Sequence, residues 1–375
     1  MIKKIQIALL FSFFIVAQKG HAQINVSEQI QTIPSNLSMY IDGYLHDLIT
    51  PQGIATLNNL QTSGKILGQW ELSLSVNLGA GIVGIPKTIQ NNYSDNFELI
   101  GNQPSLFGEG TEGSLFFQIV DEETRHPYYD PFTGEKLGFG MPLLPGAGLG
   151  VGVSPSVMPV VSLGLGYATE VSVSVLPGAL KASSKGLTGD FEITKDMMAS
   201  FGIRHDVFHW VPWMSKHNFH LTLGAAYSMM NLGSKVGDGL LGEFETGGGD
   251  YVKATNHLTG VDYGFNSYGF EAMLSKKLSF IDLSLFASTN QSEYFIKTKG
   301  SIDVDVANDF YQGSASGYET TTLNNLVDIE GNINRFLYGA ALQFNMGRVH
   351  WGFKAALSDE LYISTSLGYQ ILKNK

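Results

Sequence analysis

Residues 70–80 read WELSLSVNLGA, and this stretch decides the fold. Apolar and polar side chains alternate along all eleven residues. Such a period of two predicts a β-strand with one dry face and one wet face. In a soluble sandwich the apolar face turns toward a core, whereas in an outer-membrane barrel it turns toward lipid and the polar face lines the lumen. The rest of the chain distinguishes these two folds.

The N-terminal segment is typical of secretion. Lys3 and Lys4 precede an apolar run from Ile5 to Val16, and the sequence Gly20-His21-Ala22 ends the segment. The run is shorter than the ~20 residues of a membrane-spanning helix, so we expect a signal peptide over 1–22 that is removed after Ala22.

Composition excludes several classes of protein. The chain has no cysteine, so disulfides and thiolate metal sites are excluded. Its net charge of −11 disfavours nucleic acid as a partner. No later apolar run approaches the ~18 residues that indicate a transmembrane helix.

A single amphipathic helix is predicted near the N-terminus, over residues 36–48. Its apolar residues recur at helical spacing, and Pro51 is expected to stop it. We expect residues 23–65 to form a periplasmic segment or a plug against the barrel mouth. The stripe consists of Leu37, Tyr40, Ile41, Tyr44, Leu45 and Leu48.

After residue 66 the chain reads as strands of alternating polarity. We count ten, with two more possible in the first long connection, and therefore expect an all-β, antiparallel, up-and-down transmembrane barrel of about 10–14 strands over 66–375. The ten are 70–80, 161–167, 171–175, 197–204, 219–228, 268–275, 281–288, 336–344, 349–357 and 361–369.

The lengths of the connections favour the barrel over the sandwich. Long connections, about 82–155, 177–189, 231–263 and 299–332, alternate with short ones at 168–169, 276–277 and 345–347. Two connections depart from this pattern, the long link 205–217 and the short one at 358–360. Long extracellular loops that alternate with short periplasmic turns are the outer-membrane pattern. Aromatic residues near the strand ends fit an interfacial girdle. We therefore expect an outer-membrane location, with membrane lipid and the barrel assembly machinery as partners.

The chain also resembles a known family. The motifs are YIDGYLHDLITP (40–51), MPLLPGAGLGVG (141–152) followed by MPVVSLGLG (158–166), and FGIRHDVFHWVPWM (201–214). They are similar to uncharacterised Bacteroidota outer-membrane β-barrels classed as a domain of unknown function, and the likeness covers the mature chain. It implies a fold and a location but no activity. Long-chain fatty-acid outer-membrane channels are a more distant likeness, with an N-terminal plug and a hydrophobic lumen route.

The polar faces of the strands carry charges that we expect to line the lumen. In a narrow barrel such charges must pair or be hydrated, so a structural network is favoured over a catalytic dyad. We expect Lys354 to be held by Glu271 or Asp282. The set is Glu71, Glu170, Asp196, Arg204, His220, Glu271, Asp282, His350 and Lys354.

Three other motifs have ordinary structural interpretations. His205 and His209 have the spacing of helical metal ligands, but the aromatic residues around them favour an interfacial turn. Glycines 146–152 lack the helix that a phosphate-binding loop requires. Asp303, Asp305 and Asp309 lack the remaining ligands of a calcium loop. No metal and no cofactor is expected.

Three functional hypotheses remain open. The first is a channel or carrier for a small apolar solute, with the 36–48 helix as its gate. The second is a scaffold barrel whose long loops bind partners. The third is a hydrolase, but no nucleophile motif such as G-x-S-x-G occurs, so no enzymatic activity is expected.

Overall fold

A computed structural model describes most of the chain. The predicted signal peptide, Asp309 and glycines 146–150 lie outside the described residues. The residues described are 26–60, 66–84, 91–103, 105, 108, 113–130, 132–143, 151–177, 191–236, 244–247, 251–307 and 317–372.

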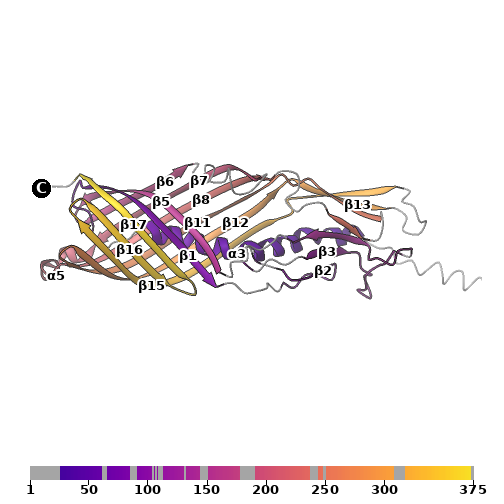
Figure 1. The fold of residues 1–375 in the computed structure, drawn as a ribbon, viewed down its shortest axis with the longest axis horizontal. Coiled ribbons are helices and arrows are strands. Elements are labelled where there is room, and N and C mark those ends of the chain that lie inside the picture. The colour runs from indigo at the N-terminus through magenta and orange to yellow at the C-terminus, as the bar shows by residue number, and fades with distance from the viewer. Residues whose placement is uncertain are drawn as a thin grey trace, which may run out of the picture.

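Within these residues, ten antiparallel strands close into a barrel (Figure 1), as the alternation predicts. Every one of the ten predicted strands is a barrel strand. In order around the barrel they are β1 (Leu72–Gly84), β17 (Leu361–Leu372), β16 (Val349–Leu357), β15 (Asp328–Met346), β12 (Ile281–Lys299), β11 (Gly260–Leu278), β8 (Phe219–Val236), β7 (Phe191–Asp206), β6 (Thr169–Pro177) and β5 (Val151–Gly166).

The outer face of the barrel is apolar. In β1, Leu74 and Val76 are 44% and 50% exposed, whereas Ser73 and Asn77 are 5% and 2% exposed. This arrangement is the reverse of a soluble core, in which the apolar side chains would be the buried ones. The apolar face of residues 70–80 therefore points away from the lumen, as predicted.

The two ends of the barrel differ in their connections. At one end, here called the short-turn end, β5 and β6 are joined by a turn at 167–168, and β11 and β12 by a turn at 279–280. The turn predicted at Lys276-Lys277 is therefore displaced, because β11 continues to Leu278. A turn at 347–348 joins β15 to β16, and the link between β7 and β8 holds two short helices, η2 (Val207–Trp210) and α5 (Pro212–Lys216).

A second body, here called the cap, is built from the long connections at the other end. One sheet has the order β2-β3-β4-β9 and the other β10-β13-β14. The described part of the first connection thus holds three short strands that belong to a separate sheet, where two barrel strands were considered possible. The strands are β2 (Phe97–Ile100), β3 (Ser114–Gln118), β4 (Gly138–Pro142), β9 (Glu245–Gly247), β10 (Val252–Asn256), β13 (Ser301–Ala307) and β14 (Tyr318–Asn324).

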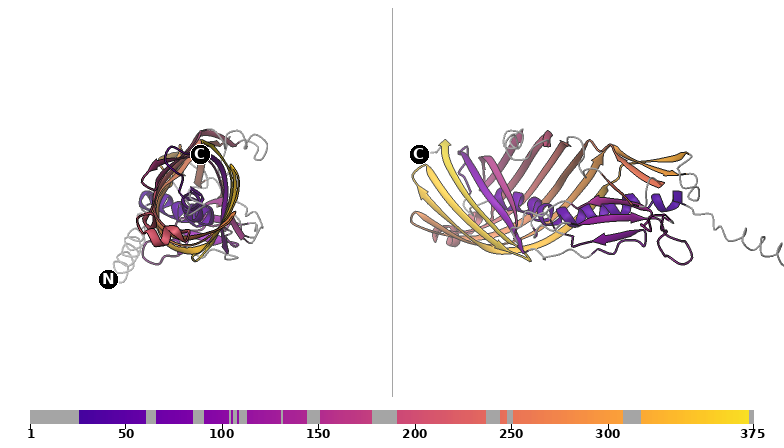
Figure 2. Two further views of the ribbon diagram at one scale, coloured as in Figure 1. Left: turned by 90° about the vertical axis from the view of Figure 1, so that its left-hand side faces the viewer. Right: turned by 45° about the vertical axis from the view of Figure 1, so that its right-hand side comes forward.

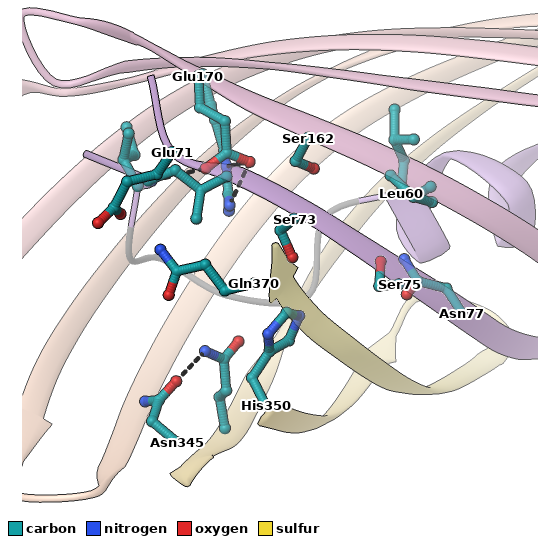
Figure 3. Close-up of a pocket in the computed structure, with 15 residues that line it drawn as sticks. Leu60, Glu71, Ser73, Ser75, Asn77, Ser162, Glu170, Asn345, His350 and Gln370 are labelled. Atoms are coloured by element: carbon teal, nitrogen blue, oxygen red, sulfur yellow. Dashed lines mark hydrogen bonds and ion pairs between the residues drawn. The ribbon is translucent and has the colours of Figure 1, made fainter. Parts of the chain in front are cut away.

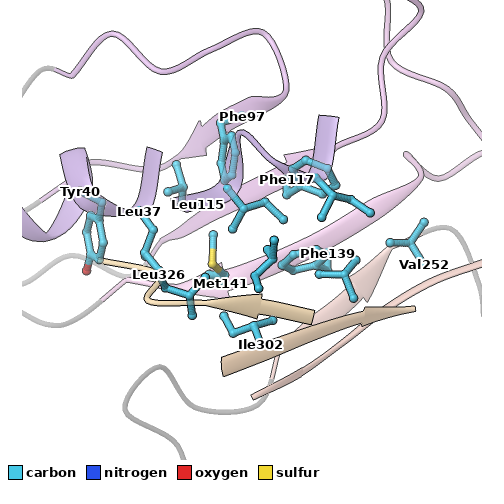
Figure 4. Packing of buried hydrophobic residues seen from close by; sticks show 14 of the residues in the cluster. Leu37, Tyr40, Phe97, Leu115, Phe117, Phe139, Met141, Val252, Ile302 and Leu326 are labelled. Carbon is cyan, nitrogen blue, oxygen red and sulfur yellow. The ribbon is translucent and has the colours of Figure 1, made fainter. Parts of the chain in front are cut away.

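In the described residues, two helices precede the barrel, α2 (Val26–Ile30) and α3 (Ile33–Leu60). The first half of α3 lies in the cap, where Leu37 and Tyr40 belong to the same buried cluster as Leu115 and Phe117 (Figure 4). Leu37, Tyr40 and Ile41 of the predicted apolar stripe are therefore buried in the core of the cap. The helix then runs along the long axis of the molecule into the barrel (Figures 1 and 2).

The predicted end of this helix at Pro51 is wrong, because α3 continues to Leu60 with Pro51 inside it. Proline lacks an N–H and usually breaks a helix. Here its ring lies against Gly81 of β1, where an added Cβ would stand 2.5 Å from the Pro51 Cβ. Contact with the barrel wall therefore outweighs the tendency of Pro51 to end the helix.

Candidate functional site

The last turns of α3 fill the barrel lumen. They contact β1, β5, β7, β8, β11, β12, β15 and β17, which lie on all sides of the helix. The end-on view shows α3 inside the ring of strands (Figure 2). Close approach requires glycine: a Cβ on Gly53 would lie 2.4 Å from the hydroxyl oxygens of Ser267 and Ser292. The lumen thus contains a helix in addition to the inward-facing side chains of the strands.

The structure brings Lys354 and Glu271 together across the lumen. Lys354 Nζ lies 2.5 Å from Glu271 Oε2, and the lysine side chain is 0% exposed. The ammonium also lies 4.2 Å from the centroid of the Phe286 ring. A buried ammonium requires such partners because it has lost its hydration. Asp282, the other carboxylate considered, instead accepts a hydrogen bond from Asn345 at 2.7 Å.

The same lysine binds the end of the helix. Lys354 Nζ donates to the carbonyl oxygen of Asn58 at 3.4 Å, and Asn77 Nδ2 donates to that of Asn59 at 2.6 Å. The last carbonyls of a helix lack partners within the helix and carry partial negative charge. The last turn of α3 contains no basic residue. The barrel wall therefore supplies the cation and the donors that complete this helix end.

A second ion pair lies toward the short-turn end. Arg204 donates to Glu170 Oε1 at 2.8 Å, and the glutamate side chain is 1% exposed. The other carboxylate oxygen of Glu170 accepts the backbone N–H of Leu67 at 2.9 Å. This pair fixes the chain where it passes from α3 to β1.

A polar cavity of about 80 Å³ lies beyond the end of the helix (Figure 3). Leu60 forms one side of it, and Glu71, Glu170, Arg204 and His350 are among the other lining residues. Glu71 accepts the backbone N–H of Gly68 at 2.8 Å. The cavity is large enough for water and is lined by polar groups, so it suits hydration rather than an apolar ligand.

The remaining predicted lumen residues form separate contacts. His220 Nδ1 lies 2.6 Å from Asp206 Oδ2, and the side chain of Asp196 lies outside the described residues. Asn58, Asn59 and Asn77, which bind around the helix end, were not predicted as site residues. Their only signal in the sequence is an Asn-Asn pair that follows the helix pattern.

The histidines considered as metal ligands have other partners. His205 lies in β7 and His209 in η2, so they do not share an α-helix. The two ring nitrogens of His205 contact Thr169 at 3.0 Å and Trp210 at 3.1 Å. Asp303 and Asp305 accept hydrogen bonds from two threonines of β14. Over the described ranges, no group of three metal-binding side chains occurs.

Among the helices in the described residues, none is long and apolar enough to cross a bilayer.

A closed antiparallel barrel with an apolar exterior and a polar lumen has the architecture of transmembrane β-barrel proteins, because closure leaves no unpaired strand edge in lipid. The chain belongs to a family of unknown function, DUF6588, whose model matches residues 1–371. A comparison with curated proteins gives no match.

Solved structures with a similar overall arrangement include three bacterial barrels. The outer membrane protease OmpT from Escherichia coli has a TM-score of 0.31 and 8% identity, covering 80% of this chain and 97% of that one. The translocator domain of the autotransporter NalP from Neisseria meningitidis has a TM-score of 0.26 and 9% identity, covering 80% of this chain and 88% of that one. The toluene transporter TbuX of Ralstonia pickettii has a TM-score of 0.22 and 8% identity, covering 86% of this chain and 98% of that one. At these values the likenesses carry no argument about activity.

Proposed function

We propose that this protein is an outer-membrane barrel that anchors the cap at the cell surface, with a lumen closed by α3. One observation carries the proposal: a single helix is both part of the cap core and the filling of the barrel. Leu37 is buried in the cap core, while Asn58 and Asn59 of the same helix are bound by the lumen wall. Such a helix fixes the cap rigidly to the membrane anchor.

Orientation follows from the connections. In outer-membrane barrels the short turns are periplasmic and the long loops extracellular. The cap would then face outward and present its surface to partners outside the cell. Further bonds attach the cap to both N-terminal helices: Gln29 Nε2 of α2 donates to the carbonyl of Val120 at 2.8 Å, and Asn36 Oδ1 of α3 accepts the N–H of Ser94 at 2.9 Å. We propose no catalytic role, since Glu271 and Glu170 each pair with a cation.

A gated carrier is the second candidate, supported by the polar cavity beneath the helix end. In that case α3 would have to leave its seat before a solute could pass. The polar lining disfavours the small apolar solute expected from the sequence.

Two measurements test the proposal together. A protease site inserted at the exposed Thr133-Gly134 turn of the cap should be cleaved in intact cells, and purified protein should give no steady conductance in planar bilayers. A site cleaved only after the outer membrane is opened would contradict the orientation. Steady conductance of the unmodified protein would favour the carrier. Recovery of the protein in the soluble fraction would contradict both.

A further inference from the structure

An open groove of about 710 Å³ crosses the outer wall of the barrel over β11, β12, β15, β16 and β17. It exists because Ala340 and Ala355, paired across β15 and β16, are short. Leu285 and Phe353 stand at its sides. Its volume falls within the roughly 300–1,000 Å³ typical of ligand sites.

One end of this groove is cationic. Lys276 lines it, and its Nζ lies 4.4 Å from the centroid of the Phe219 ring. In the part of the chain that the structure describes, no carboxylate forms an ion pair with Lys276. The residue precedes the turn at 279–280 and so lies at the short-turn end. A lysine at this level of a membrane barrel places its ammonium among the lipid headgroups.

Three of the connections at this end carry only positive charges. Residues 207–218, 276–280 and 345–348 contain Lys216, Lys276, Lys277 and Arg348 but no aspartate or glutamate. The first long connection, 82–155, has the opposite balance, and the whole chain has a net charge of −11. The cationic rim is therefore local to the short-turn end.

We propose that the groove binds one acyl chain of an anionic phospholipid, whose phosphate contacts Lys276. The inference rests on the proposed membrane location. Neighbouring outward-facing leucines would leave a void beside Ala340 and Ala355 that a flexible chain fills. A second copy of the barrel could also cover an apolar groove, but it would not require a cation at one end. A basic residue near the headgroups favours anionic lipid.

Native mass spectrometry of the detergent-solubilised full chain tests the site, with phosphatidylglycerol and phosphatidylcholine as probes. Lys276→Gln should weaken phosphatidylglycerol binding about fivefold, as expected for one cation at an anionic surface, and leave phosphatidylcholine binding unchanged. Ala355→Phe should fill the groove and weaken both by about tenfold or more. Ala340→Leu provides a milder filling variant.

Matched controls locate the effect. Arg348→Gln removes a cation from the same rim without changing the groove, and Ala199→Leu enlarges an outward residue of β7 outside it. The proposal would be overturned if Lys276→Gln and Arg348→Gln bound phosphatidylglycerol equally well. It would also be overturned if Ala355→Phe and Ala199→Leu bound the two lipids equally well. A dimer of the unmodified chain lost with Ala355→Phe would assign the groove to a second copy. A difference in gel mobility between boiled and unboiled protein reports barrel formation separately. Failure of the membrane assignment can therefore be distinguished from failure of the lipid site alone.

Discussion

Lys354 and Glu271 face each other across the lumen, 2.5 Å apart, at the point where the helix ends. The lysine therefore has two functions: it neutralises a carboxylate of β11 and donates to a carbonyl of α3. A strand near the C-terminus of the chain thus holds a helix from its N-terminal region. Closing the barrel and seating the helix are coupled through this one ammonium.

The first prediction concerns this ion pair. Lys354→Met should lower the free energy of unfolding by about 3–5 kcal/mol, because Glu271 is left buried without its cation. Adding Glu271→Gln should recover part of that loss. Urea unfolding of the barrel in lipid vesicles measures both. Lys216→Met, at an exposed lysine of α5, serves as the control and should have little effect. If Lys354→Met matched this control, the lumen would be wet at that point.

The second prediction concerns the two faces of β1. Leu74→Arg should cost on the order of 2–4 kcal/mol, because a charge on the lipid face near the bilayer midplane is poorly solvated. Ser75 lines the polar cavity, so Ser75→Arg can be hydrated there and should be tolerated better. Refolding yields into vesicles compare the two. Equal yields would contradict the assigned faces.

The barrel strands could be predicted because their signal is local. Alternation along 70–80 depends only on which side of one strand faces lipid, so no distant contact is needed to recognise it. The cap strands gave weaker signals because they are short and many of their side chains are buried. Phe117 and Gln118 are adjacent in β3 and both buried.

The position of α3 in the lumen could not be predicted, because it depends on contacts between residues that are distant in the sequence. Asn58 and Lys354 are 296 positions apart. Alternation placed Lys354, Glu271 and Asp282 on the lumen side, but the choice of partner depends on how the closed barrel positions β11 and β12 opposite β16. Likewise, Pro51 signals a helix end unless the glycine that accommodates its ring is known.

The third prediction concerns a turn of the cap at Asp121. Its carboxylate accepts hydrogen bonds from the backbone and hydroxyl of Thr124 and from the hydroxyl of Tyr128. These bonds lower the pKa of Asp121 to about 2. Because this pKa is depressed, the stabilisation is complete above the usual value of 3.8 and is lost as the pH falls through about 2.

Hydrogen exchange of the segment around residue 124 measures this effect. Corrected for intrinsic rates, protection should decrease between pH 4 and pH 2. Asp121→Asn should abolish the dependence on pH, because the amide does not titrate. Glu122→Gln, at the exposed neighbouring residue, should retain it. An unchanged pH profile in Asp121→Asn would show that another group controls the turn.

The fourth prediction tests the position of α3 with two glycines of one strand. A Cβ on Gly81 would lie 2.5 Å from Pro51 Cβ and 3.1 Å from Cε1 of Tyr362, whereas a Cβ on Gly84 would meet nothing within 4 Å. Gly81→Ala should therefore push the helix away from the wall and destabilise the barrel by about 1–3 kcal/mol, the usual cost of overpacking. Gly84→Ala is the matched control, because it replaces a glycine of the same strand where the added Cβ does not contact α3.

Urea midpoints of the two alanine variants give the comparison. Both substitutions lose the conformational freedom of glycine, so this effect largely cancels and the difference reports the contact with Pro51. Further substitution of Pro51 by glycine would remove the Cβ atom that the new alanine meets and should narrow the gap between Gly81→Ala and Gly84→Ala. Equal midpoints for the two variants would mean that α3 does not lie against β1, and the closed lumen on which the proposed function depends would then be wrong.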